Sequence, residues 1–316
     1  MRRKIYIAGH TGLVGASLVR LFSQRENIQL VLASHSELDL TRQQSVENFL
    51  EQTRPDTVIV AAGRVGGIQA NTRQPAQFIY ENLMMEANVI HASWKSGINR
   101  LLNFGSSCVY PKICCQPMTP DLLMTGKIET TNEPYALAKL AGMSLCSSYN
   151  RQYGTSYINV IPANLYGPGD NFDLERCHVV SALIRKFHEA KLRKESKVIL
   201  MGSGQVTRDF LFVDDFALAC EVMLKEYNGE EAVNVGAQAP CTIRQLSSAI
   251  REVVNFSGDI VWDTTKPDGA PERLLDASVI QKIGWKAQTC LREGLQKTYQ
   301  WFLNNITEEE KRQCAS

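Results

Sequence analysis

Long apolar runs are missing from this sequence of 316 residues, in which 44% of the side chains are hydrophobic. No stretch approaches the eighteen or so consecutive apolar residues of a membrane-spanning helix. The first apolar run, Ile5 to Ala8, ends at Gly9 and is too short for the core of a secretory signal. These absences favour a cytoplasmic globular protein, long enough for one large α/β unit or two modest lobes.

An excess of charge of either sign is also missing, because the 34 basic side chains are nearly balanced in number by 33 acidic ones. A balanced surface offers nothing that would hold nucleic acid or an anionic membrane through net charge. We therefore expect neither of them as a partner. If the protein binds a charged nucleotide, we expect side chains and amides at the binding site itself, not the net charge, to hold it.

Paired cysteine spacings are absent as well. The nine cysteines form an odd set, Cys114 and Cys115 are adjacent, and no histidine lies at zinc-finger spacing. A large chain without a secretory signal has little need of a disulfide framework. We expect most of the cysteines to be small buried side chains or surface thiols without a function, and we expect no metal site.

A glycine-rich loop follows the first predicted strand. Lys4 to Ala8 is a short apolar run, and Gly9-His-Thr-Gly-Leu-Val-Gly15 comes next and opens a helical stretch. Glycines at this spacing let the backbone approach a pyrophosphate, while the helix N-terminus supplies amide groups and a positive dipole. A tight turn with close helix packing is the alternative. The place between strand and helix favours a dinucleotide site.

Strands and helices continue to alternate along the chain. The pattern predicts an α/β fold with a Rossmann-type doubly wound parallel sheet and a smaller C-terminal α/β substrate-binding lobe. We expect the dinucleotide-binding domain at 1–165, with a returning segment near 210–240, and the substrate lobe mainly at 166–316. Further strands are expected at 29–33, 57–61, 100–104 and 157–161, and helices at 43–53, within 75–96 and at 179–191.

The second predicted strand runs into Ser34, His35 and Ser36, with no carboxylate among them. Sites selective for NAD carry an Asp or Glu near this point, where it binds the ribose 2′-hydroxyl. A carboxylate would repel the 2′-phosphate of NADP, so its absence favours NADP over NAD. No arginine is present in the segment, and the three side chains are equally plausible as ordinary loop residues.

Tyr135 and Lys139 are spaced i and i+4 in a segment without internal glycine or proline, so on a helix they share one face. A fixed cation lowers the pKa of a phenol, and we therefore expect Tyr135 to exchange a proton near neutral pH. Ser106 follows the predicted strand at Gly105, where its hydroxyl could hold the same carbonyl oxygen. A half-buried helix tyrosine and a turn-capping serine are the alternative.

Basic residues gather in the second half of the chain, among them Lys186 and Arg208. Each charge taken alone is explained by solvation. Together in one lobe they raise the possibility of a pocket for a diphosphate.

These motifs resemble the extended short-chain dehydrogenase/reductase superfamily and, within it, the GDP-L-fucose synthase family. The glycine loop and the Tyr135/Lys139 pair alone would indicate only the superfamily. The similarity covers nearly the whole chain, and Gly105-Ser-Ser-Cys108 together with His178 narrows it to the family. Other matching segments are Val65-Gly-Gly-Ile68, Thr131-Asn-Glu-Pro-Tyr135, Tyr149-Asn-Arg-Gln-Tyr-Gly154, Asn164-Leu-Tyr-Gly-Pro168, Asp170-Asn-Phe172 and Lys266-Pro-Asp-Gly269.

The resemblance implies a bifunctional enzyme that acts on GDP-4-keto-6-deoxy-D-mannose. Ser106, Tyr135 and Lys139 would carry out an NADPH-dependent reduction at C4. Cys108 and His178 would epimerise C3 and C5, whose protons the C4 ketone acidifies, through an enolate.

The resemblance also implies a GDP-sugar as substrate and a homodimer joined through the helices after Pro75 and around Tyr135. The substrate-binding candidates are Ser107, Lys186, Met201, Arg208 and Asp268. From the glycine loop, the strand ends and the resemblance, the cofactor-binding candidates are Gly9, Thr11, Gly12, Leu13, Val14, Gly15, Ser34, His35, Asp39, Leu40, Ala61, Ala62, Lys139, Pro162, Ala163, Asn164, Leu165 and His178.

The chain departs from its family at several points. Met201 stands where related bacterial enzymes have Trp, Lys186 stands where Arg can occur, and arginines of some relatives are absent at Thr11, Ala33 and His35. A related GDP-4-keto-sugar enzyme of the colitose or 6-deoxyheptose type, or one with a single activity, is therefore the alternative. A non-enzymatic nucleotide-sensing protein would have no reason to keep all five catalytic candidates.

Overall fold

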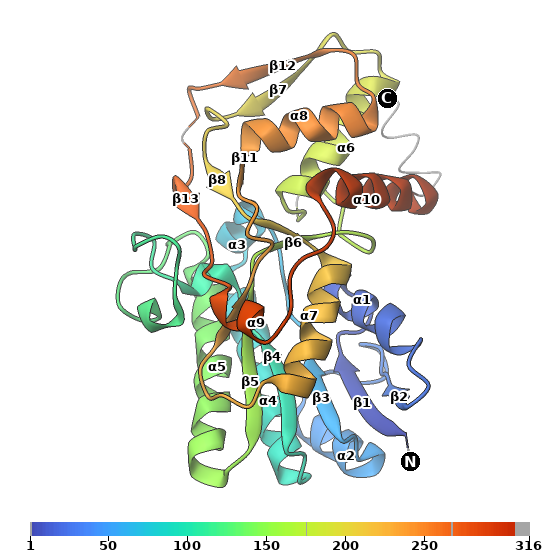
Figure 1. Ribbon diagram of the computed structural model, residues 1–316, viewed down its shortest axis with the longest axis vertical. Coiled ribbons are helices and arrows are strands. Elements are labelled where there is room, and N and C mark those ends of the chain that lie inside the picture. Colours follow the sequence, from blue (N-terminus) through green and yellow to red (C-terminus); the bar gives the residue numbers. More distant parts are fainter. Residues whose placement is uncertain (1, 175, 267, 307–316) are drawn as a thin grey trace.

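The computed structural model describes residues 2–174, 176–266 and 268–306. Its centre is a six-stranded sheet in which every neighbouring pair of strands is parallel (Figure 1). The predicted doubly wound α/β fold is thereby confirmed. The strand order is β10-β5-β4-β3-β1-β2, so the direction of winding reverses between β1 and β3, where such sheets bind ligands at their carboxyl ends. The strands are β1 (Arg3–Ala8), β2 (Ile28–Val31), β3 (Thr57–Val60), β4 (Arg100–Phe104), β5 (Ser156–Pro162) and β10 (Val233–Val235).

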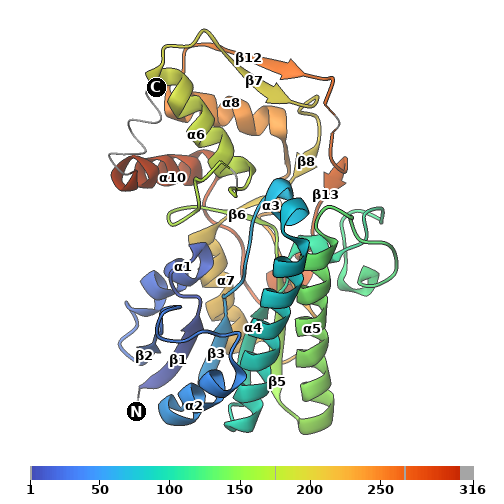
Figure 2. The same cartoon turned by 180° about the vertical axis from the view of Figure 1, so that it is seen from behind.

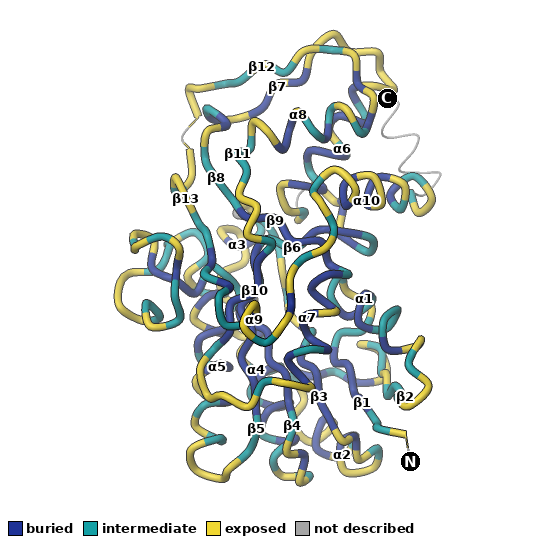
Figure 3. The backbone as a smooth tube through the Cα atoms, viewed as in Figure 1, coloured by how far each residue is buried: buried dark blue, intermediate teal, exposed yellow. Residues whose placement is uncertain are grey.

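Helices cover both faces of the sheet. On one face, α1 (Leu13–Phe22) packs beside α7 (Val213–Glu226), and the other face carries α2, α4 and α5 (Figures 1 and 2). Strands covered on both faces are apolar along their length, and Thr57–Val60 is buried at every position (Figure 3). The three helices on the second face are α2 (Gln43–Thr53), α4 (Pro75–Lys95) and α5 (Glu133–Tyr153).

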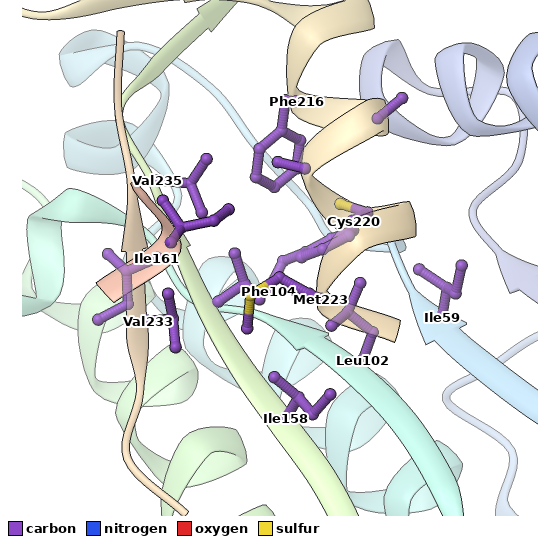
Figure 4. Packing of buried hydrophobic residues seen from close by; sticks show 14 of the residues in the cluster. Ile59, Leu102, Phe104, Ile158, Ile161, Phe216, Cys220, Met223, Val233 and Val235 are labelled. Carbon is purple, nitrogen blue, oxygen red and sulfur yellow. The ribbon is translucent and has the colours of Figure 1, made fainter. Parts of the chain in front are cut away.

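The main core lies between the sheet and α7 (Figure 4). Phe104 from β4 meets Phe216 from α7 with ring centroids 5.2 Å apart. Ile158, Cys220 and Met223 fill the space around them and are almost completely buried. This packing fixes the carboxyl ends of β4 and β5, from which the candidate site is built.

A second lobe sits beyond the carboxyl edge of the sheet, with a core of its own around Phe187 and Leu246 (Figure 1). The helix α8 begins with a capping box, in which Thr242 and Gln245 satisfy each other's amides. The lobe contains α6 (Val179–Leu192), α8 (Ile243–Val254) and α10 (Leu291–Asn305), the strand pair β7 (Lys197–Met201) and β12 (Asp259–Asp263), and the small sheet of β8 (Thr207–Arg208), β11 (Cys241–Thr242) and β13 (Glu272–Arg273).

The connection between the lobes is a short parallel pair of β6 (Asn164–Tyr166) and β9 (Phe210–Phe212). Because β10 returns to the central sheet from beyond this crossing, the two lobes share the middle of the chain. The domain boundary at residue 165 stays a prediction. The remaining elements are α3 (Ile68–Arg73), α9 (Ser278–Lys282) and the short 3₁₀ turns at Ser107–Val109 and Pro120–Leu122.

The largest difference from a predicted strand end is at β2, and β3 ends one residue earlier than predicted, at Val60. β2 stops at Val31, which pairs with Tyr6, whereas the prediction extended the strand to Ala33. The chain then turns, and the amides of Glu37 and Leu38 donate to the Ser34 carbonyl. Within the described residues, no helix is both long enough and apolar enough to cross a bilayer.

Candidate functional site

The glycine loop lies between β1 and α1, at the point where the winding reverses. Gly9 has φ +80°, and the Gly12 amide donates to its carbonyl at 3.2 Å. A Cβ on Gly15 would overlap the Gly9 carbonyl oxygen and stand 2.7 Å from the Cα of His10. Gly12 caps α1 without a side-chain hydrogen bond, which leaves the first amides of the helix for an anion. This arrangement fits a dinucleotide pyrophosphate.

The segment after β2 holds a carboxylate that the sequence prediction missed. Glu37 accepts hydrogen bonds from the amide and the hydroxyl of Ser34, both at 2.7 Å. These bonds hold the pKa of Glu37 below its ordinary value, and the charge of His10 adds to the effect. A negative charge therefore stands where the sequence suggested none. The missed signal was a Glu three residues after Ser34, beyond the expected strand end.

The other cofactor candidates fall at strand ends or in the core. Asp39 is occupied by the amide and hydroxyl of Thr41 at 2.9 and 2.7 Å. Leu40 is buried in the core beside α2, so its side chain packs against protein. Asn164 donates through its side-chain amide to the Asp209 carbonyl at 3.0 Å. Thr11 and His35 are exposed, and Leu13 and Val14 half-exposed, around the glycine loop and the β2 turn; Ala61 and Ala62 follow β3, and Pro162, Ala163 and Leu165 lie where β5 passes into β6.

Four of the five catalytic candidates come together at the carboxyl end of β4. Ser106 leaves this strand, and both the amide and the thiol of Cys108 donate to its hydroxyl, at 3.4 and 3.2 Å. Tyr135 and Lys139 face this loop from the first turns of α5, with the ammonium 6.0 Å from the phenol ring centroid. The Ser106 hydroxyl also forms a hydrogen bond with the phenol. A carbonyl oxygen placed here would meet two hydroxyl donors.

The protonation of Tyr135 differs from the sequence prediction, which expected Lys139 to lower the phenol pKa towards neutrality. Burial instead raises the pKa of Tyr135 to about 12, and Lys139 and the Ser106 hydrogen bond reduce the rise without cancelling it. Cys108 and Glu86 add to the increase. The prediction was wrong because it considered one neighbour and left out burial. The phenol is thus protonated at neutral pH, which is the form that donates a proton.

Cys108 is a thiol that resists ionisation. Burial raises its pKa above the ordinary value, while the Ser106 hydrogen bond and the cations Arg273 and Lys139 pull it down. Arg273 comes from the second lobe and donates to the carbonyls of Ser107 and Tyr110 at 2.7 and 3.3 Å. It therefore fixes the loop that carries Cys108 and brings a positive charge towards the thiol.

His178 is the exposed N-cap residue of α6, in the second lobe. Its charge lowers the pKa of the nearby Asp170 carboxyl, although burial raises that pKa overall. The Ser181 hydroxyl donates to Asp170 and holds it in place. In the part of the chain that the structure describes, no hydrogen bond or ion pair joins His178 to Cys108. A sugar ring would have to lie between the two if both act on it.

The substrate candidates, apart from Ser107, belong to the second lobe. Lys186 is exposed and donates to the Ile199 carbonyl at 2.9 Å. Asp268 accepts from the amide and hydroxyl of Ser203 at 2.9 and 2.6 Å. Met201 is 67% exposed at the end of β7.

Arg208 stands in register with Arg273 on the neighbouring strand β13. Arg208 is half-buried and donates to the Thr207 carbonyl at 2.7 Å. Burial lowers the pKa of Arg208, and the Arg273 charge lowers it further. Among the described residues neither guanidinium forms an ion pair, so both remain available to an anion such as a diphosphate.

Comparison with known proteins finds relatives over nearly the whole chain. Residues 5–236 match the family described as NAD dependent epimerase/dehydratase. The chain is 48% identical over 303 residues to GDP-L-fucose synthase 1 of Arabidopsis thaliana, covering 96% of this chain and 94% of that protein. It is 47% identical over 313 residues to the GDP-L-fucose synthase of Escherichia coli K12, covering 96% and 98%. A solved GDP-mannoheptose C4 reductase from Campylobacter jejuni with NADP bound has a TM-score of 0.87 at 35% identity, covering 96% of this chain and 98% of that one.

A dinucleotide loop with a Ser-Tyr-Lys cluster at the carboxyl edge of a parallel sheet defines the class, the NAD dependent epimerase/dehydratases. Within that class, the chain belongs to the GDP-L-fucose synthase family.

Proposed function

We propose that the protein converts GDP-4-keto-6-deoxy-D-mannose to GDP-L-fucose, by epimerisation at C3 and C5 and then reduction at C4. The observation that carries the proposal is the joint placement of Ser106, Cys108, Tyr135 and Lys139 beside a dinucleotide loop. Ser106, Tyr135 and Lys139 suit a carbonyl reduction, whereas a thiol at the same point suits proton transfer at neighbouring carbons. The kinship with GDP-L-fucose synthases supports the same reaction.

Epimerisation needs one proton removed and one returned at each carbon. We assign these transfers to Cys108 and His178, which would stand on either side of the sugar ring. As a thiolate, Cys108 takes a proton from a carbon next to the ketone, and the electrons pass to the C4 oxygen as an enolate. The Ser106 and Tyr135 hydroxyls stabilise this oxygen by hydrogen bonds. Return of a proton from the opposite face inverts the centre and restores the ketone.

Reduction uses the same oxygen. When bound, NADPH supplies the hydride that adds to C4. Tyr135 releases its phenolic proton to the oxygen, and Ser106 holds the oxygen in line. Lys139 is positioned beside the phenol to stabilise the phenolate that remains.

NADP is the cofactor that the family favours, in agreement with the sequence expectation, and the related heptose reductase carries it. The amides at the start of α1 suit its pyrophosphate, and Ala61, Ala62 and Asn164 line the adjoining strand ends. The Arg208 and Arg273 guanidinium groups suit the diphosphate of the GDP-sugar.

The direct test is incubation of the purified protein with GDP-4-keto-6-deoxy-D-mannose and either NADPH or NADH. We expect reduced cofactor to disappear and GDP-L-fucose to appear in the NMR spectrum in equal amounts. No consumption of either cofactor with this sugar would contradict the proposal.

A second candidate substrate is a GDP-4-keto-heptose. It is favoured by the exposed Met201 at the end of β7 and by the likeness to the heptose reductase. Parallel incubation with both sugars distinguishes the two candidate substrates. If the heptose is the substrate, kcat/KM for the GDP-4-keto-heptose exceeds that for GDP-4-keto-6-deoxy-D-mannose.

We further propose a homodimer formed by the outer faces of α4 and α5, which lie side by side (Figure 2). Tyr80 and Leu83 on α4 and Leu137 and Tyr153 on α5 are exposed large apolar residues on these helices. Burial of such side chains is a common reason for association.

We also propose that the enzyme works in the cytosol. All eight described cysteines are free thiols, which is the state that a reducing compartment maintains.

A further inference from the structure

A buried ion pair stands behind the reductive site, and it involves a residue that no motif singled out. Glu86 in the middle of α4 is 1% exposed, and its Oε1 lies 2.5 Å from the Lys139 Nζ. The Lys139 side chain is itself only 5% exposed. Desolvating two charges costs as much free energy as their attraction returns, so such a pair adds little to stability by itself. Its place beside Tyr135 gives it another use.

The surrounding residues leave room for this carboxylate. A Cβ on Gly142, one turn after Lys139 on α5, would overlap the Glu86 carboxylate. The Asn103 side chain on β4 lies near the same carboxylate. Burial raises the pKa of Glu86, and Lys139 and Asn103 oppose the rise because both favour the charged form. Cys146 on α5 is the other titratable group that senses the Glu86 charge.

Burial lowers the pKa of Lys139, but Glu86 and Tyr135 outweigh this effect and shift the pKa upward. Glu86 also raises the pKa of the Tyr135 phenol. The groups that face the phenol are Lys139 from the same helix, Glu86 from α4, and Cys108 and Ser106 from the loop after β4. With the carboxylate present, Lys139 and Tyr135 both keep their protons to high pH.

We propose that Glu86 is a positioning residue of the reductive step: its carboxylate anchors the Lys139 ammonium and keeps the Tyr135 phenol protonated until hydride arrives. Lys139 and Tyr135 titrate as a coupled pair. Without Glu86, the first proton leaves this pair at lower pH, whichever of the two residues releases it. The reactive combination of a cation and a neutral phenol then disappears at lower pH. This inference rests on the proposed function, in which Tyr135 donates the proton.

The test is the pH dependence of hydride transfer in Glu86→Gln, followed with NADPH and with its 4-deuterated form, whose isotope effect isolates that step. We expect the alkaline limb of the rate to move down by at least about one pH unit, because a charge a few ångströms away has been removed. The rate at neutral pH should change far less. A limb at the parent position, or a uniform fall in rate at every pH, would overturn the proposal.

Glu86→Asp keeps the charge but retracts it from Lys139, so its limb should lie between those of the parent and Glu86→Gln. If Glu86→Gln fails to fold, the Asp variant decides, and a limb equal to that of the parent contradicts the proposal. Glu47→Gln is the matched control, because Glu47 makes a 2.5 Å contact with Lys95 on the other side of α4 from the site. Its limb should not move.

Comparison of the parent enzyme with Tyr135→Phe distinguishes failure of the proposed function from failure of the proposed role of Glu86. Hydride transfer by the parent that collapses in Tyr135→Phe supports the proposed function, whatever the Glu86 variants do. If Tyr135→Phe reduces at the parent rate, the proposed function fails at its donor, and the role of Glu86 fails with it.

Discussion

At the scale of single residues, Cys108 decides whether the protein is an epimerase as well as a reductase. Burial raises the pKa of its thiol, so the thiolate fraction is small at neutral pH and grows as the pH rises towards that pKa. We predict that solvent deuterium exchange into the sugar rises with pH in the same way. Mass spectrometry of the sugar at a series of pH values measures this dependence.

Cys108→Ser should abolish the exchange, because a serine hydroxyl is a far weaker acid than a thiol and supplies no anion near neutral pH. Cys290→Ser, at an exposed cysteine on the second lobe, is the matched control and should exchange like the parent. Exchange that survives at the parent rate in Cys108→Ser would remove Cys108 from the mechanism.

Glu37 leads to a prediction about cofactor choice. Its carboxylate holds the Ser34 amide and hydroxyl, which a 2′-phosphate would otherwise use, and it repels that phosphate. We predict that Glu37→Gln raises the ratio of kcat/KM for NADPH to that for NADH by about tenfold, equivalent to ~1.4 kcal/mol. Glu26→Gln, at an exposed glutamate before β2, serves as the control. An unchanged ratio in Glu37→Gln would show that Glu37 plays no part in cofactor selection.

Residue spacing predicted which side chains carry the chemistry, but it could not predict their protonation. The i and i+4 spacing of Tyr135 and Lys139 placed both on one helix face, as the structure has them. The phenol pKa depends also on burial and on Glu86, which lies 49 positions away and reaches Lys139 only through helix packing. The contact of Arg273 with Ser107 could not be predicted for the same reason, since it spans 166 positions.

At the scale of elements, the turn from β1 to α1 depends on one glycine more than on its neighbour. A methyl group at Gly15 would overlap the Gly9 carbonyl oxygen, whereas one at Gly12 would stand 3.6 Å from it, in ordinary contact. We predict that Gly15→Ala lowers the free energy of unfolding by about 1–3 kcal/mol, because the helix must shift against the loop. Denaturant unfolding measures the loss, and equal stabilities of Gly15→Ala and Gly12→Ala would contradict this packing.

The elements of the central sheet were the most predictable part of the fold. Buried parallel strands are short apolar runs, and β2, β3, β4 and β5 could be located within one or two residues, whereas β10 was expected only within a returning segment near 210–240. The end of β2 was misplaced, because the hydrogen bonds to the Ser34 carbonyl and the Glu37 carboxylate start a turn that apolarity does not signal. The two-residue strands β8, β11 and β13 carry no periodic pattern and could not be predicted.

At the scale of the whole molecule, the proposed dimer predicts that association depends on the outer face of α5. Tyr153 is 47% exposed and stacks on Trp94 of α4 with ring centroids 4.4 Å apart. We predict that Tyr153→Glu converts the dimer to a monomer by placing a charge in an apolar contact. Sedimentation equilibrium measures the mass, and Ile113→Glu, at a position that is 89% exposed and outside α4 and α5, is the control. A parent protein that sediments as a monomer would contradict the proposed assembly.

The arrangement of the lobes explains why the site could be predicted only in part. Ser106, Tyr135 and Lys139 lie within one sheet lobe, whose parallel topology brings strand ends together. His178, Arg208 and Asp268 belong to the second lobe, so their positions relative to Cys108 depend on how that lobe packs against the sheet lobe. The sequence suggested Arg208 through the gathering of basic residues, suggested His178 and Asp268 through a family resemblance, and gave no distances.

The most direct test of the whole account is a single reaction of the parent protein with GDP-4-keto-6-deoxy-D-mannose and NADPH in deuterated water. We predict GDP-L-fucose that carries deuterium at both C3 and C5, formed with one equivalent of NADPH consumed. If the ketone is reduced but the product carries deuterium at neither position, the protein is a reductase without epimerase activity. That result would contradict the roles of Cys108 and His178. No loss of NADPH would contradict the account at its centre.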